Sequence, residues 1–205
     1  MRAQVVIFAG PSGTGRSRLC ALFAEELGLP TINLDDFYND GSDPTLPRVP
    51  TGLGQDSVDW DDPGSWLCEQ AVDALERLCR DGFADVPVYD ISQDGRIGHR
   101  TLDLGGSALL VAEGIFAQEV IADTRMRGIL ADSICVRQHP VVTFWRRLVR
   151  DLRERRKPPR MLLRRGLRLM RAEPHIVAHA VSLGCTAMLP DEAYRRVQAL
   201  MRALC

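Results

Sequence analysis

Residues 10–17 read GPSGTGRS and directly follow residues 5–9, which read VVIFA. The apolar run predicts a buried strand, and the leucine and phenylalanine spacing after the glycines predicts a helix over residues 16–27. A strand, a glycine-rich loop and a helix in this order are typical of phosphate binding, because the glycines let backbone N–H groups turn inward around phosphate oxygens. The alternative is a tight glycine turn without a ligand, which the offsets of the glycines and the serine make less favoured. The predicted phosphate-binding residues are Gly10, Ser12, Gly13, Thr14, Gly15, Arg16 and Ser17.

The loop departs from the G-x-x-x-x-G-K-[ST] pattern at one position, where Arg16 stands in place of lysine. Either the site works with an unusual cation or a nucleotide-binding fold has lost its chemistry. The chain contains a single lysine, Lys157, and its other cationic side chains apart from histidine are arginines. Such a skew indicates that Arg16 reflects a general replacement of lysine by arginine.

The composition describes an ordinary globular protein. At 205 residues, with 45% hydrophobic and 26% charged residues, the chain is expected to form one domain over residues 1–205. The formal net charge of -1 argues against a general nucleic-acid binder. Acidic residues crowd residues 35–62 and arginines crowd residues 146–171, which suits a cleft for metal and phosphate but also ordinary solvated faces.

The cysteines and the apolar runs bear on location. The six cysteines are scattered without a C-x-x-C pair, so we expect reduced thiols of a cytoplasmic protein. No apolar stretch approaches the roughly 18 residues that a membrane span requires. The first residues read as a strand and not as a signal peptide. We therefore expect neither a membrane nor a nucleic acid among its partners.

Short apolar runs alternate with helical patterns, which indicates an α/β fold with a central, mostly parallel sheet flanked by helices. We expect a small β-hairpin from residues 86–89 and 101–104, joined by a turn at residues 94–96. Residues 40–63 are rich in Gly, Pro and Asp and read as a long loop, of a kind that is usually functional or disordered. The other expected elements are strands at 3–9, 31–34, 108–113 and 133–136, a helix at 64–81, and helices from residue 140 onward with breaks at Pro158–Pro159, Pro174, Gly184 and Pro190.

Two acidic positions follow predicted strands. Glu113 ends an apolar strand, where open α/β sheets place ligand groups, and could hold a metal with Ser17. Asp35 and Asp36 also follow a strand, and a kinase needs a carboxylate there to accept the proton of the acceptor hydroxyl. The alternatives are a helix-capping acid for Glu113 and an N-cap or turn pair for the two aspartates.

Residues 146–157 are a basic helix that runs into two prolines. Arginines that close over transferring phosphates stabilise their negative charge, so this stretch could be a lid. A solvated face is the strong alternative, and a nucleic-acid surface is less favoured because few aromatic residues are interleaved. The four histidines lack metal-ligand spacing and read as structural.

These motifs, taken in order, resemble the uridine kinase (uridine–cytidine kinase) family of P-loop kinases, related to phosphoribulokinase and pantothenate kinase. The resemblance covers most of residues 4–175. It rests on the loop at 10–17, LDDFY at 34–38, DWDDP at 59–63, PVYD at 87–90, EGI at 113–115 and the basic helix at 146–157.

The resemblance implies an ATP-dependent (or other NTP-dependent) kinase with Mg²⁺, a P-loop kinase fold and an arginine-rich helical lid at about residues 146–171. Asp35 would be the general base on a nucleoside 5′-hydroxyl, and Ser17 and Glu113 would organise the metal. Arg150 and Arg155 would face the phosphates. Residues implied to contact the small-molecule substrate are Tyr38, Trp60, Asp61, Tyr89, Arg147 and Lys157, although core packing is the alternative for the aromatic ones. Family members are often oligomeric, so a homo-oligomer is an expectation too.

The chain departs from the family pattern at more than Arg16. The family's histidine five residues after the tyrosine that matches Tyr89 is Asp94 here, and the carboxylates after the strand at 133–136 are replaced by Arg137 and Gln138. These changes concern the acceptor more than the fold. The predictions are a kinase of a nucleoside or similar alcohol, then a non-catalytic nucleotide-binding protein, and last a binding module that uses its basic helix on nucleic acid.

Overall fold

The computed structural model describes residues 2–50, 56–153 and 159–204, with only part of the side chains between 150 and 165. Its centre is a parallel sheet in the order β2-β7-β1-β8-β9. The strands are β1 (Gln4–Ala9), β2 (Thr31–Asn33), β7 (Leu109–Glu113), β8 (Leu130–Val136) and β9 (Thr186–Met188). The predicted α/β class and mostly parallel sheet are confirmed.

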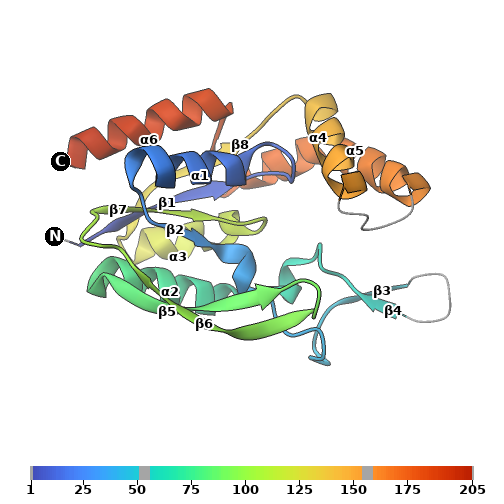
Figure 1. Cartoon of the computed structure of the whole chain (residues 1–205), viewed down its shortest axis with the longest axis horizontal. Helices are drawn as coiled ribbons and strands as arrows, with labels where there is room; N and C mark the ends of the chain where they lie inside the picture. The colour runs from blue at the N-terminus through green and yellow to red at the C-terminus, as the bar shows by residue number, and fades with distance from the viewer. Residues whose placement is uncertain (1, 51–55, 154–158, 205) are drawn as a thin grey trace.

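Helices cover both faces of this sheet (Figure 1). On one face lie α1 (Arg16–Leu27) and α6 (Pro190–Leu204), and on the other α2 (Cys68–Asp81) and α3 (Ile121–Met126). Strand β1 alternates between them: Val5 and Ile7 belong to the core beneath α2, whereas Phe8 packs on Phe23 of α1. This period of two is what a strand buried on both faces requires.

Helices α4 (Pro140–Arg153) and α5 (Pro159–Ser182) pack on each other at the end of the molecule where the strands terminate (Figure 1). Because all five strands are parallel, their carboxyl ends meet at this edge, which is where ligands bind in open α/β sheets. The short 3₁₀ helix η1 (Leu34–Phe37) follows β2 there, and η3 (Ala117–Val120) precedes α3.

The predicted hairpin is present and longer than expected. Strands β5 (Phe83–Asp90) and β6 (Gly95–Asp103) pair antiparallel, with Asp94 at a positive φ of 47° in the turn. The expected helix at 64–81 begins only at Cys68. The residues before it form the 3₁₀ helix η2 (Pro63–Ser65), which the side chain of Asp62 caps by accepting from the N–H of Gly64.

Three expectations for the loops and helices need correction. The long loop at 40–63 contains a short antiparallel pair, β3 (Arg48–Pro50) and β4 (Asp56–Val58). Pro174 does not break α5, because buried Glu173 and buried Ala180 anchor the helix on both sides of it. Strand β9 was missed, since the chain after residue 140 reads as mainly helical.

Candidate active site

The loop between β1 and α1 has the backbone that its glycines predict. Gly10 has a φ of 135°, and a Cβ there would lie 2.4 Å from the carbonyl oxygen of Val136. Gly13 has a φ of 89°, and its Cβ would lie 2.9 Å from the carbonyl oxygen of Thr143 in α4. Only glycine fits both the conformation and the space. The loop is therefore held between β8 and α4 in a fixed turn.

Arg16 is buried beneath this loop with 9% of its surface exposed. Its Nε donates to Glu113 Oε2 at 2.5 Å, and its Nη1 donates to the carbonyl oxygens of Gly10 and Gly114, each at 2.8 Å. Its Nη2 lies 3.7 Å from Asp35 Oδ2. The guanidinium thus donates hydrogen bonds to groups at the carboxyl ends of β1 and β7, and it faces Asp35 just after β2. All of these groups lie at the carboxyl edge of the sheet.

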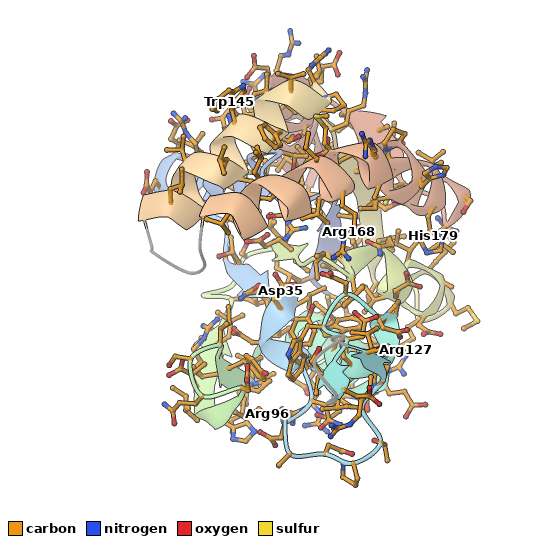
Figure 2. All side chains as sticks on the ribbon, turned by 90° about the vertical axis from the view of Figure 1, so that its right-hand side faces the viewer. Asp35, Arg96, Arg127, Trp145, Arg168 and His179 are labelled. Atoms are coloured by element: carbon orange, nitrogen blue, oxygen red, sulfur yellow. The ribbon has the colours of Figure 1, made fainter. Side chains whose placement is uncertain are left out.

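Asp35 lies at the carboxyl edge of the sheet, in η1 directly after the outermost strand β2 (Figure 2). Its Oδ1 accepts from the backbone N–H of Ile115 at 2.7 Å, and its own N–H donates to Asn33 Oδ1 at 3.1 Å. Burial raises the pKa of Asp35 above its ordinary value, whereas the charge of Arg16 and the Ile115 hydrogen bond oppose that shift. The carboxylate is oriented by the backbone and keeps Oδ2 on the side of Arg16.

Three aromatic rings of the predicted substrate pocket pack together. Tyr38 contacts Trp60 and Tyr89 with ring centroids 5.6 and 5.8 Å apart, and Trp60 lies 6.3 Å from Tyr89. The Tyr38 hydroxyl donates to the carbonyl oxygen of Trp60 at 3.0 Å. Burial raises the pKa of Tyr38, and the nearby charges of Asp35 and Asp61 raise it further. The aromatic cluster therefore lies beside the predicted base.

A cleft of about 550 Å³ adjoins the aromatic cluster. Trp60 is the one predicted site residue that lines it. The other lining residues come from the loop after η1, from β4 and from the β5–β6 turn: Asp40, Gly41, Ser42, Ser57, Val58, Gln93, Asp94 and Gly95. Tyr89 contacts Trp60 at its border, and burial, together with the charges of Asp94 and Asp40, raises the Tyr89 pKa to about 12.

Helix α4 lies directly against the phosphate-binding loop, and α5 packs on α4. Arg147, which the resemblance places toward the substrate, is 5% exposed and donates from Nη2 to the carbonyl oxygen of Ser12 at 2.6 Å and to Glu173 at 2.9 Å. Glu173 also accepts from the Thr143 hydroxyl at 2.5 Å. Sequence reasoning missed Glu173, and nothing in the residues around it points to a partner 26 positions away.

The remaining predicted residues divide into two groups. Ser17 lies exposed at the start of α1, and Asp61 lies in the loop before η2, where its Oδ2 is 3.9 Å from Nη2 of Arg168 in α5. Arg168 reaches this loop from the helical side of the site (Figure 2). Arg155 and Lys157 lie outside the described residues, and so does the side chain of Arg150.

The acidic residues at the sheet edge fit the magnesium that the resemblance implies. Mg²⁺ prefers oxygen ligands and is commonly held by one or two carboxylates together with substrate phosphates and water. Glu113 would supply a carboxylate and Ser17 the hydroxyl, although Arg16 already occupies one oxygen of Glu113. Among the described residues, no group of three or more His, Cys, Asp or Glu side chains could hold a metal ion.

Two further observations concern the helices and the cysteines. Within the part of the chain that the structure describes, no helix has both the length and the apolar character needed to cross a bilayer. The five described cysteines, Cys20, Cys68, Cys79, Cys135 and Cys185, are free thiols, as predicted.

Comparison with known proteins finds relatives among kinases. The phosphoribulokinase / uridine kinase family model matches residues 5–170. The chain is 29% identical to a uridine kinase of Deinococcus deserti over 175 residues, which cover 83% of this chain and 79% of that protein. It is 30% identical to the inorganic pyrophosphatase TTM1 of Arabidopsis thaliana and 27% identical to a uridine kinase of Schizosaccharomyces pombe. These two matches cover 78% and 75% of this chain, but only 22% and 33% of those longer proteins.

Solved structures agree on the fold. A candidate fructose transport system kinase from Silicibacter sp. TM1040 superposes with a TM-score of 0.65 at 19% identity, over 86% of this chain and 85% of that one. A D-glycerate 3-kinase from Cryptococcus neoformans superposes with a TM-score of 0.51 at 17% identity, over 85% and 78%. With the family match over residues 5–170 and the phosphate-binding loop at the carboxyl edge of a parallel sheet, the chain belongs to the phosphoribulokinase / uridine kinase family and has a P-loop kinase fold.

Proposed function

We propose that the protein is an ATP-dependent kinase that transfers the γ-phosphoryl group to a hydroxyl of a small molecule, first of all the 5′-hydroxyl of a nucleoside. The observation that carries the proposal is the placement of Asp35. Its carboxylate faces the same sheet edge as the phosphate-binding loop, with Oδ1 fixed by Ile115 and Oδ2 left on the side of Arg16. A base in this place can meet an acceptor hydroxyl next to a bound triphosphate.

The reaction needs little covalent chemistry from the protein. The acceptor oxygen attacks the γ-phosphorus in line, the bond from that phosphorus to the β–γ bridging oxygen breaks, and ADP leaves. The hydroxyl proton passes to a carboxylate oxygen of Asp35. Catalysis of this kind rests on positioning and on neutralising the charge of the phosphates. When bound with the nucleotide, Mg²⁺ would supply part of that neutralisation, held by Ser17 and Glu113.

The acceptor would bind against the aromatic cluster. Tyr38, Trp60 and Tyr89 offer ring surface beside Asp35, and Asp61 would accept hydrogen bonds from ribose hydroxyls. Asp94 borders the adjoining cleft, where the family pattern has a histidine. Since a carboxylate only accepts hydrogen bonds, an acceptor that presents amino or hydroxyl donors suits this cleft better than one that presents carbonyls. Its free thiols accord with a cytoplasmic enzyme.

A second candidate is a nucleotide-binding protein without catalysis. It is favoured by Arg16, which bonds Glu113 and two carbonyl groups and so differs from a lysine aimed at phosphate. Backbone N–H groups of the loop would still bind phosphates in that case.

The two candidates separate in a coupled assay of ADP release with Mg-ATP across nucleosides and other small alcohols. The native protein, Arg16→Lys and Asp35→Asn are compared, and the phosphorylated product is identified by mass spectrometry. We expect weak to moderate native turnover, a gain in Arg16→Lys, and near-complete loss in Asp35→Asn. No turnover by the native protein and Arg16→Lys, with ATP still bound, would establish the second candidate instead.

A further inference from the structure

A second arginine lies over the phosphate-binding loop. Nη1 of Arg146, in α4, is 3.4 Å from the position that a Cβ on Gly15 would take. The residue is exposed and makes no hydrogen bond or ion pair with any other residue that the structure describes. Its charge is therefore available at the loop, whereas that of Arg16 is already engaged by Glu113.

The position of Arg146 is fixed by its neighbours on the same helix. Thr143 precedes Arg146 by three residues and Arg147 by four, so each arginine neighbours Thr143 on the surface of α4, with Arg147 on the buried side and Arg146 on the exposed side. Thr143 packs its backbone against Gly13, and Arg147 bonds the carbonyl oxygen of Ser12. The buried contact of Arg147 with Glu173 ties this face to α5 as well. Arg146 is thus held over the loop by the packing of α4.

Arg16 is not free to take the same role. Moving its guanidinium toward a phosphate would leave the carbonyl oxygens of Gly10 and Gly114 without this donor, and both residues are buried. The same movement would also break the ion pair of Arg16 with Glu113, and the Glu113 carboxylate would then repel the negatively charged phosphates of the nucleotide. Buried polar groups left without partners are unfavourable, so Arg16 stays with the carboxylates.

We propose that two arginines divide the role of a P-loop lysine: Arg16 is a fixed cation that positions Glu113 and Asp35, and Arg146 is the cation that binds the nucleotide phosphates. This inference rests on the proposed function only in requiring that a triphosphate binds at the loop. It needs no acceptor and no turnover.

The test measures binding of inorganic triphosphate, which has no base or ribose, by isothermal titration calorimetry. Losing a hydrogen bond to a charged group corresponds to about 10- to 100-fold in affinity, so we expect that loss for Arg146→Ala. Arg146→Lys should keep most of the affinity. Arg202→Ala, which removes the same charge from the exposed end of α6, serves as the matched control and should bind as the native chain does.

A double variant separates direct binding from a structural effect. In Arg16→Lys/Arg146→Ala, a lysine at the pattern's usual position should recover about 10-fold of the lost affinity. The proposal is overturned if Arg146→Ala binds triphosphate as tightly as Arg202→Ala, or if the double variant recovers no affinity. It is also overturned if the native chain does not bind triphosphate. If triphosphate binds as expected but no acceptor is phosphorylated, the proposed function fails and this inference stands.

Discussion

The guanidinium of Arg16 contacts the groups that a kinase would use for metal binding and proton transfer. It bonds Glu113 directly and approaches Asp35, so its charge acts on both carboxylates. The sequence shows Arg16 only as an arginine at the usual lysine position, so the direction in which its side chain points could not be predicted. The direction depends on Glu113, which is 97 positions away in the chain.

The decrease of kcat/KM at acid pH should depend on the contact between Arg16 and Asp35. A base works only when deprotonated, so activity is present above the pKa of Asp35 and is lost as the pH falls through it. Burial raises that pKa, which moves the loss of activity to higher pH than an ordinary aspartate gives, while Arg16 pulls the pKa down. Arg16→Met should therefore shift the acid limb of kcat/KM to still higher pH. Arg16→Lys keeps the charge and serves as the control; an unmoved limb in Arg16→Met contradicts the assignment.

Trp60 belongs to the aromatic cluster and also lines the cleft, so its substitution should weaken binding of the acceptor and leave binding of the nucleotide unchanged. Trp60→Ala is expected to raise the acceptor KM by about 10-fold, since a buried aromatic contact contributes about 1–3 kcal/mol. The KM for ATP should stay within about 2-fold. Trp145→Ala removes an exposed tryptophan from α4 and is the matched control. Equal changes in both KM values for Trp60→Ala would exclude a specific role in acceptor binding.

At the scale of elements, α4 contacts the phosphate-binding loop and α5 supports α4 from behind its contact residues. The contacts are Arg147 with Ser12, and Glu173 with both Arg147 and Thr143. Nε and Nη1 of Arg147 are also buried without a hydrogen-bond partner, which leaves its charge dependent on Glu173. That the basic helix acts as a lid stays a prediction. The resemblance assigned Arg147 to the substrate, whereas the structure places that side chain against the loop.

Glu173→Gln should destabilise the fold strongly. Removing one partner of a buried ion pair costs about 3–5 kcal/mol, because the other charge is left uncompensated. The free energy of unfolding in urea measures this loss. The double variant Arg147→Met/Glu173→Gln removes both charges and should recover part of the stability. If Glu173→Gln has the same free energy of unfolding as the native chain, the ion pair of Arg147 with Glu173 contributes nothing to stability.

At the scale of the whole molecule, the sequence predicted what local patterns specify. The β1–loop–α1 unit, the alternation of strands and helices and the β5–β6 hairpin are confirmed, because apolar period and turn residues encode them. Strands β3, β4 and β9 were not predicted, since β3 and β4 lie in a Gly-, Pro- and Asp-rich stretch that reads as a loop and β9 lies in a stretch that reads as mainly helical. The continuation of α5 through Pro174 and the pairing of Glu173 depend on tertiary contacts, which a single sequence does not display.

Nucleotide binding should stabilise the entire domain, because the loop, α1, α4 and the sheet meet at one site. A ligand present at 100 times its Kd adds about 2.7 kcal/mol to the free energy of unfolding when it binds only the folded state. ATP at that ratio should therefore raise the urea midpoint of the native chain. Asp35→Asn should show the same increase, because Asp35 acts on the acceptor. No increase for either protein would argue against a nucleotide site at the loop.

The most direct test of the central claim is the rate of acceptor-dependent ADP release, measured for the native protein and for Asp35→Asn at saturating Mg-ATP. The account predicts that the native protein turns over and that Asp35→Asn loses at least about 100-fold in kcat while its affinity for ATP is kept. If Asp35→Asn turns over at the native rate, or if the native protein binds ATP and phosphorylates no acceptor, the account is contradicted.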